Sequence, residues 1–300
     1  MTYQYGPVVV GVDGSQHSIG ALRWAADEAC RWTRMLLAVS VLPPDAALDA
    51  QREQERIADW AAEEARRWRV GVAAVGETHR GRPIEVLRRL AEDARLVVVG
   101  GRGAGEHLDP PLGSVARALG HRADAPVLIV HNAQRWASPE AVLPHTGPVV
   151  VGFDGSEPAL RTLRPAFEEA AARCDRLVIV QAWRHPDLWH PGSARGSDLS
   201  TDEAAVHEAL CETIRPWHAE HPLLEVEVRS EPGDPVDALA AASQWATLLV
   251  LGTQCPADHA RPPHPSVTAR LLEYAACPVL VAHGPARIPA HAEATAAVVA

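Results

Sequence analysis

The stretch VVVGVDGS at residues 8–15 returns, with one substitution, as VVVGFDGS at residues 149–156. The spacing of 141 residues continues without gaps into the next apolar run, where LLAVSV at 36–41 aligns with LVIVQA at 177–182. A repeat that persists over this length indicates that the chain is a tandem duplication of one structural unit.

Two later pairs of apolar runs keep the repeat but at a wider spacing. RLVVVGG at 95–101 aligns with TLLVLGT at 247–253, and APVLIV at 125–130 aligns with CPVLVA at 277–282, both 152 residues apart. The second copy is therefore longer by eleven residues, which we assign to a loop insertion at 184–200, RHPDLWHPGSARGSDLS.

Each copy alternates short apolar runs with longer amphipathic segments. The apolar runs are nearly continuous in Val, Ile and Leu, as expected for strands buried on both faces. After Ser15, a plausible N-cap, the residues Ile19, Leu22, Ala26 and Ala29 share one face of a helix. Alternating strands and helices predict an α/β fold with two tandem doubly wound parallel-sheet domains.

The repeat also sets the expected domain boundaries. We expect one domain over residues 1–131, a linker over 132–147, a second domain over 148–283 and a loose tail over 284–300. The tail is rich in proline and alanine, which is typical of a weakly ordered terminus.

Composition excludes several classes of partner. The formal net charge of −10 argues against binding to nucleic acid or to an anionic membrane surface. No apolar run approaches the ~18 residues needed to span a bilayer, and the start of the chain lacks the pattern of a signal peptide. Five scattered cysteines without metal-binding spacing are typical of reduced thiols, so we expect a cytoplasmic protein.

All 28 basic residues are arginine, so the chain contains no lysine. This excludes the P-loop lysine, the protein-kinase lysine and a Schiff-base lysine. GxSxG, HExxH and paired-carboxylate motifs are also missing from the sequence. We therefore expect a protein that is not an enzyme, although slow ATP hydrolysis remains open.

The glycine-rich stretch GGRGAGEHLDPPLGS at 100–114 follows the fourth expected strand. Glycines allow backbone N–H groups to approach phosphate oxygens, and the start of the next helix at Gly113-Ser114 would add further donors. Asp13 follows the first strand, at the same edge of the expected sheet. On the residues alone, this loop could hold a ligand or could be a plain connection.

The order of motifs resembles the universal stress protein family. Three motifs show the resemblance. The first is the strand–GVDGS–helix unit, and the second is a GxP motif at Gly81–Pro83. The third is the pattern G-x2-G-x9-G-[ST], which is matched in full by Gly100, Gly103, Gly113 and Ser114. The resemblance extends over most of the chain. It implies tandem five-stranded domains of the adenine nucleotide α-hydrolase-like type, with ATP as the ligand, either alone or with Mg²⁺.

The same resemblance implies roles for individual residues. Val12 and Asp13 would line the adenosine side, Asp13 near the ribose, and Val41 would contact the adenine. The phosphates would be surrounded by Gly100, Gly103, Gly113, Ser114 and Val115. Arg102 would either screen phosphate charge or be a solvated surface arginine. Pro110 and Pro111 would stiffen the spacer.

The second copy departs from the glycine pattern. At the aligned positions it has Gly252, Cys255 and then Pro265-Ser266, and the proline removes one N–H donor. We expect this copy to be degenerate as a nucleotide site. His259, Arg261 and His264 in the same loop leave an anion or metal site as the alternative, although their spacing fits no familiar metal motif.

Three functions are compatible with the sequence. The first is an ATP-binding regulatory stress protein that holds the nucleotide in its N-terminal copy. The second is a protein-interaction scaffold with a vestigial nucleotide site, and the third is a weak ATPase or related nucleotide-using enzyme. Proline at one end of the runs 125–130 and 277–282 suggests edge strands. The resemblance implies that these two strands pair the copies as a pseudo-dimer, that two chains form a homodimer, and that a regulatory protein partner exists.

Overall fold

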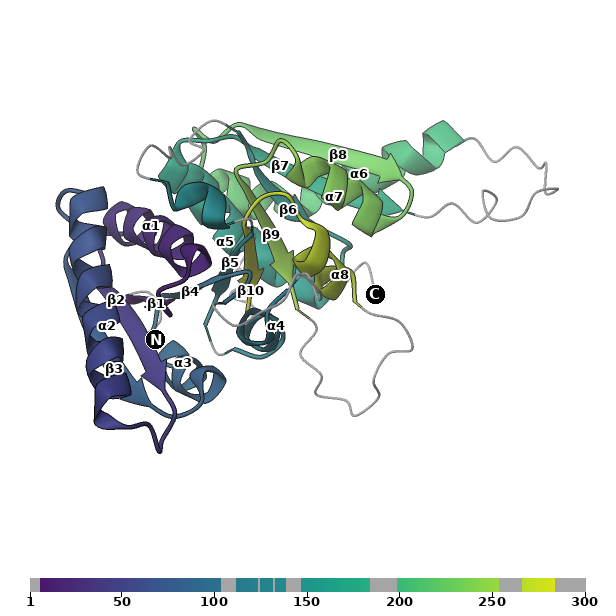
Figure 1. The fold of residues 1–300 in the computed structure, drawn as a ribbon. Helices are drawn as coiled ribbons and strands as arrows, with labels where there is room; N and C mark the ends of the chain where they lie inside the picture. The colour runs from purple at the N-terminus through teal and green to yellow at the C-terminus, as the bar shows by residue number, and fades with distance from the viewer. Residues whose placement is uncertain are drawn as a thin grey trace.

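The computed structural model describes residues 6–103, 112–123, 125–131, 133–138, 147–183, 199–253 and 266–283. The part up to residue 131 is the N-terminal half, and the part from residue 147 is the C-terminal half (Figure 1). The N-terminal half alternates strands and helices in the order β1 (Val8–Gly11), α1 (Gln16–Arg31), β2 (Leu36–Leu42), α2 (Leu48–Trp68), β3 (Ala74–Arg80), α3 (Pro83–Ala91), β4 (Leu96–Gly100), α4 (Ser114–His121) and β5 (Val127–Val130).

The C-terminal half repeats this order after a short 3₁₀ helix, η1 (Ala133–Trp136). Its elements are β6 (Val149–Gly152), α5 (Glu157–Arg173), β7 (Leu177–Trp183), α6 (Leu199–Glu220), β8 (Val226–Pro232), α7 (Pro235–Ser243), β9 (Leu248–Gly252), α8 (Val267–Tyr274) and β10 (Val279–Ala282). Most of the expected insertion, at 184–198, and the expected tail at 284–300 lie outside the described residues.

The ten strands of the described residues form one sheet in the order β3-β2-β1-β4-β5-β10-β9-β6-β7-β8. Pairing is parallel within each half, and β5 and β10 join the halves as an antiparallel pair in which Leu128 lies opposite Leu280. The pseudo-dimer pairing that the resemblance implies is therefore present. The expectation that these two strands lie at sheet edges is wrong for the whole chain, because they end their own halves but pair with each other, which leaves β3 and β8 outermost.

Helices cover both faces of the sheet, as the continuous apolar runs require. On one face Leu22 of α1 and Phe167 of α5 belong to the same buried cluster as Val8 and Val10 of β1. On the other face the helices α3, α4, α7 and α8 pack over a second cluster. This arrangement confirms a doubly wound α/β fold in each half.

The beginning of the linker is packed against α1. Gly20 lies so close to it that a Cβ atom there would be 1.8 Å from the carbonyl oxygen of Ala133. The buried guanidinium of Arg23 donates to the carbonyl of Trp136 at 2.7 Å and also to that of Ser138. Residues 133–138 are thus held by the N-terminal half.

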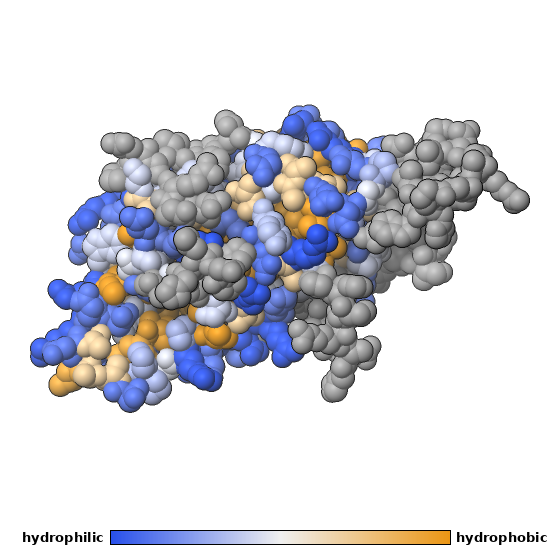
Figure 2. All heavy atoms as spheres, turned by 45° about the vertical axis from the view of Figure 1, so that its right-hand side comes forward, coloured by the Kyte–Doolittle hydropathy of each residue, from blue (hydrophilic) through white to orange (hydrophobic). Residues whose placement is uncertain are grey.

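Among the coloured residues on the face drawn in Figure 2, hydrophobic ones form patches separated by hydrophilic ones. Within the described ranges, the structure contains no helix long and apolar enough to cross a membrane.

Candidate functional site

The turn between β1 and α1 forms one wall of the candidate site. The buried Val12 extends β1 by donating its N–H to the carbonyl of Val39 at 2.9 Å. The exposed Asp13 accepts a hydrogen bond from the N–H of Ser15 at its Oδ1 atom (3.0 Å), and Gly14 adopts the left-handed conformation with φ +78°. Ser15 caps α1, as predicted, because its Oγ accepts from the N–H of Ser18. These local bonds hold the Asp13 carboxylate at the carboxyl end of β1.

The ends of the glycine-rich loop form the second wall. The N–H of Gly101 donates to the carbonyl of Val130 at 2.9 Å, and the N–H of Gly113 donates to the carbonyl of Gly101 at 2.8 Å. The second of these bonds closes the loop at its base, next to the carboxyl end of β4. The central part of the loop, residues 104–111 with Gly105, Pro110 and Pro111, lies outside the described residues.

Two of the glycines leave little room for a side chain. A Cβ atom at Gly100 would lie 2.8 Å from the carbonyl oxygen of His17, in the first turn of α1. A Cβ atom at Gly103 would lie 3.0 Å from Oδ2 of Asp13, so the two walls are in contact here. At Gly101 the nearest atom would be 3.5 Å away, which is an ordinary contact. Close packing against backbone therefore requires glycine at position 100. At position 103 a methyl group would only displace the exposed Asp13 side chain by a small amount, and position 101 has room for one.

Helix α4 begins at the base of the loop. Its N-cap is Gly113, which has an extended conformation (φ −68°, ψ 159°). Because glycine has no side chain, it offers no side-chain acceptor to the N–H groups of the first turn. Ser114 is exposed and Val115 is half-buried at the start of this helix. The first turn of a helix carries backbone N–H groups without intrahelical partners and a partial positive charge, which together favour an anion.

The remaining predicted residues lie at the same edge of the sheet. Val41 is half-buried near the end of β2, and Arg102 is half-buried directly after Gly101. Because β2, β1 and β4 are adjacent and parallel, Val41, Asp13 and the glycines follow three neighbouring strands at their carboxyl ends. Adjacent strands are about 4.8 Å apart, so this row extends over about 10 Å.

The corresponding turn in the C-terminal half has the same geometry. Oδ1 of Asp154 accepts from the N–H of Ser156 at 3.0 Å, and Gly155 has φ +78°. Ser156 caps α5 by accepting from the N–H of Ala159 at 3.3 Å.

The helix after the fourth strand of that half is different. Helix α8 is capped by its own sequence, since the Oγ of Ser266 accepts from the N–H of Ala269 at 3.1 Å. The hydroxyl of Thr268 donates to the carbonyl of Gly252 at 2.6 Å, and Thr253 stands where the N-terminal half has Gly101. Cys255, His259, Arg261, His264 and Pro265 lie outside the described residues. In the parts that are described, no group of three metal-ligating side chains comes together.

The structure adds a residue that the sequence analysis did not single out. His131 follows β5, and its Cα atom would lie 3.7 Å from a Cβ atom at Gly101. Its Nε2 atom donates to the carbonyl of Leu272 in α8 at 2.7 Å, and burial lowers the pKa of the imidazole, which is therefore neutral near pH 7. His131 thus connects the base of the glycine-rich loop to the C-terminal half. No local sequence pattern indicates this contact, because it depends on the pairing of β5 with β10.

Comparisons with known proteins identify the family and the fold. The family model of the universal stress protein family matches residues 4–131 and again residues 146–283. A universal stress protein of Mycolicibacterium smegmatis is 30% identical over 298 residues, covering 93% of this chain and 97% of that protein. A universal stress protein of Mycobacterium tuberculosis strain H37Rv is 30% identical over 295 residues, covering 92% and 95%. A solved universal stress protein from Archaeoglobus fulgidus shares the fold, with a TM-score of 0.68 at 19% identity over 92% of this chain and 97% of that chain. Two matches to the family model in one continuous sheet show that the chain belongs to the universal stress protein family and has the tandem form of it.

Proposed function

We propose that the N-terminal half binds one molecule of ATP and that the protein has a regulatory role in a stress response. The observation that carries the proposal is the row of residues at the ends of β2, β1 and β4. From Val41 through Asp13 to Gly100 and Gly113, it presents an apolar surface, a carboxylate and then a helix N-terminus. This is the order of base, ribose and phosphates along an adenine nucleotide.

The proposed contacts follow from the chemistry of each position. Val12 and Val41 would contact the adenosine, with Val41 against the base, and the Asp13 carboxylate would accept hydrogen bonds from the ribose hydroxyls. The phosphates would be bound by backbone N–H groups and the serine hydroxyl of the second wall, which comprises Gly100, Gly103, Gly113, Ser114 and Val115. Arg102 lies beside the same loop and would add positive charge.

Backbone donors support binding more than catalysis. Amide groups at a helix N-terminus stabilise the charge of phosphates without activating water. Asp13, the carboxylate of the first wall, is assigned to the ribose in this proposal and not to the terminal phosphate. We therefore propose that ATP is held rather than hydrolysed, with Mg²⁺ as an optional counter-ion.

The C-terminal half is proposed to hold no nucleotide. In α8 the first-turn amide of Ala269 already has the Ser266 hydroxyl as acceptor. A phosphate would have to displace this bond, and Pro265 offers no N–H to replace it. The proposal therefore specifies one nucleotide per chain.

Equilibrium dialysis of the full, nucleotide-stripped chain against ATP tests this proposal. We expect one site per chain in the wild type. In Gly113→Glu, where a carboxylate enters the phosphate site, we expect ATP affinity to fall at least a hundredfold. The matched control Pro265→Glu, at the aligned position, should keep one site, and circular dichroism should show that both variants are folded.

Each alternative function has its own outcome in this experiment. No binding by the wild type would favour the protein-interaction scaffold, and two sites per chain would contradict the asymmetry. Release of phosphate from bound ATP, lost in Gly113→Glu, would favour the enzyme.

A further inference from the structure

Two equivalent glutamates of the repeat meet where the halves contact each other. Glu28 lies in α1 and Glu169 lies 141 residues later in α5, the spacing of the repeat in this region. Both carboxylates are buried, with 1% and 7% of the residue exposed. Buried carboxylates are rare unless they are paired with a cation, so their partners determine the properties of this contact.

Arg173 connects the two glutamates. Its guanidinium forms an ion pair with Glu28 across the halves and another, from Nε at 3.3 Å, with Glu169 one turn earlier on its own helix. Glu28 has a second cation, because Arg31 of α1 donates to it at 2.7 Å. The two glutamates are therefore not equivalent, since Glu28 has two arginines whereas Glu169 shares one. We call Glu28, Arg31, Glu169 and Arg173 the inter-half charge cluster.

The surrounding charges do not remove this imbalance. Arg95, which precedes β4, lies 3.8 Å from Glu168 and is stacked over the ring of Trp32 at 3.6 Å. Glu168 also pairs with Arg164 of its own helix at 3.6 Å. Arg34 beyond α1 and Asp175 beyond α5 also contribute charge near the cluster. Glu169 thus has Arg173 as its direct cation and Arg31 and Arg95 as more distant ones.

The unequal partners affect the two carboxyl groups in opposite directions. Burial raises the pKa of Glu28, but the charges of Arg173 and Arg31 outweigh it, so this pKa lies below its usual value. Burial, together with repulsion from Glu28, raises the pKa of Glu169 to about 7. Protonation turns Glu169 into a hydrogen-bond donor in a cluster where Oε2 of Glu28 has no partner among the described residues.

We propose that Glu169 is a proton-binding site in the contact between the two halves, and that proton uptake there tightens this contact as the pH falls below neutral. The unfolded chain binds this proton only near the ordinary pKa of a glutamate, about 4.3. Stability from this site is therefore fully present below that value and is lost as the pH rises through about 7. Glu28, with its lowered pKa, changes protonation only below this window and does not contribute to it.

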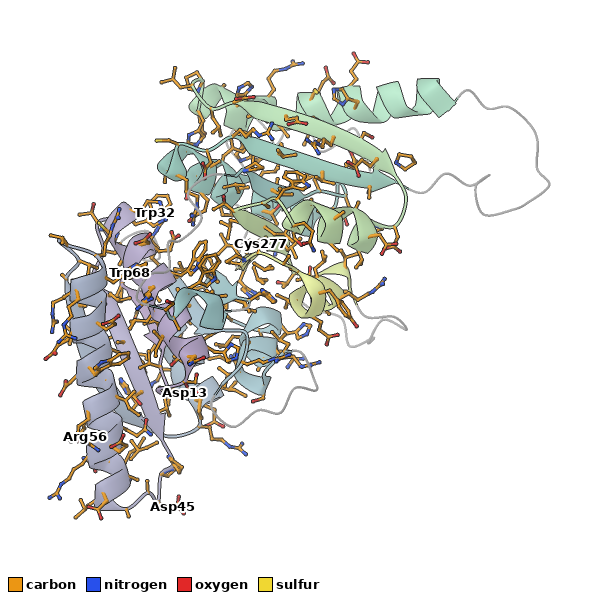
Figure 3. All side chains as sticks on the ribbon, turned by 45° about the horizontal axis from the view of Figure 1, so that its top comes forward. Asp13, Trp32, Asp45, Arg56, Trp68 and Cys277 are labelled. Carbon is orange, nitrogen blue, oxygen red and sulfur yellow. The ribbon has the colours of Figure 1, made fainter. Side chains whose placement is uncertain are left out.

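This proposal is independent of ATP binding. Figure 3 labels Asp13 and Trp32 at opposite ends of α1. Glu28 and Arg31 of the inter-half charge cluster lie in the last turn of α1, next to Trp32. The sixteen residues of α1 correspond to about 24 Å at 1.5 Å per residue.

The test is urea unfolding of the full chain between pH 6 and pH 8.5, for the wild type and Glu169→Gln. Titration of histidines such as His131 also affects stability here, so the difference between the two proteins is the quantity to measure. The ratio of the wild-type unfolding constant to that of Glu169→Gln should be on the order of tenfold smaller at pH 6 than at pH 7.5. Parallel pH profiles would overturn the proposal.

Two further variants keep the test decisive. Glu168→Gln is the matched control, because Glu168 lies on the same helix and is less buried. This variant should keep the wild-type pH dependence of stability. If the pH dependence disappears in Glu168→Gln, the proton is bound by Glu168 instead. Glu28→Gln removes the repelling charge, so the pH dependence should move to lower pH even if Glu169→Gln does not fold. An unchanged midpoint in Glu28→Gln would contradict the coupling between the two glutamates.

Hydrogen exchange locates the effect. After correction for the chemical exchange rate, amides of α1 and α5 should lose protection as the pH rises from 6 to 8.5, whereas those of α2 should not. Equal loss in all helices would mean that the proton is not bound at the contact between the halves.

Discussion

The N-terminal and C-terminal halves are alike after their first strands and different after their fourth strands. Asp13 and Asp154 each accept a backbone N–H at 3.0 Å from the serine two residues later, and Gly14 and Gly155 both have φ +78°. The same turn occurs in the half that we expect to bind no nucleotide, so its role in beginning a helix is enough to explain it. The turn alone is therefore weak evidence for a ligand.

The difference between the halves identifies the informative region. Helix α4 begins at a glycine without a side-chain cap, whereas α8 is capped by Ser266. A helix N-terminus without a side-chain cap can give its donors to a ligand, but a capped one has given part of them to its own chain. The glycine-rich loop and its cap, more than the aspartate, distinguish a candidate site from its degenerate copy.

The largest effect among these variants should come from adding a methyl group to Gly100, which is more closely packed than Gly101 or Gly103. In Gly100→Ala the new Cβ atom meets the backbone of His17 at 2.8 Å, so we expect a loss of about 1–3 kcal/mol in the free energy of unfolding. ATP affinity should also decrease, since the two walls must move apart. Gly101→Ala is the control, and urea unfolding should show little change there, because its nearest contact is 3.5 Å. Equal losses in the two variants would contradict the close-packing argument.

Replacement of the two equivalent aspartates would sharpen the comparison. Asp13→Ala removes the hydrogen bond from the N–H of Ser15, and Asp154→Ala removes those from the N–H and the hydroxyl of Ser156, so we expect a cost of about 1 kcal/mol per bond in unfolding free energy. Only Asp13→Ala should reduce ATP affinity in equilibrium dialysis. Reduced binding in Asp154→Ala at unchanged stability would indicate a nucleotide in the C-terminal half.

The smallest effect is expected when Ser266, the N-cap of α8, is replaced by glycine, the residue type that caps α4. Ser266→Gly removes the side-chain acceptor of α8, and glycine at an N-cap costs only a few tenths of a kcal/mol. We expect no second ATP site, since Cys255 and Pro265 still replace two glycines of the motif. A gain of ATP binding in this variant would mean that the serine cap alone had closed the site.

Much of the fold could be predicted because its signals are local. The apolar runs and the serine cap of α1 depend on neighbouring residues, and the structure confirms them. The glycine spacing likewise places the loop after β4. The reason for each glycine was not predictable, since Gly100 and Gly103 are constrained by His17 and Asp13, about 90 residues away in the chain.

By itself, the sequence determined the duplication, the alternation of strands and helices, and the asymmetry between an intact and a degenerate glycine motif. These features depend on the order of residues along the chain, so the periodicity and spacing of the sequence are enough to predict them. The family resemblance implied the pairing of β5 with β10, which the structure contains. Only the tertiary structure decided that His131 reaches Leu272 and that Glu28 and Glu169 share Arg173. The physical reason is that burial and the electric field at a carboxylate depend on which distant side chains surround it, which no spacing in the sequence encodes.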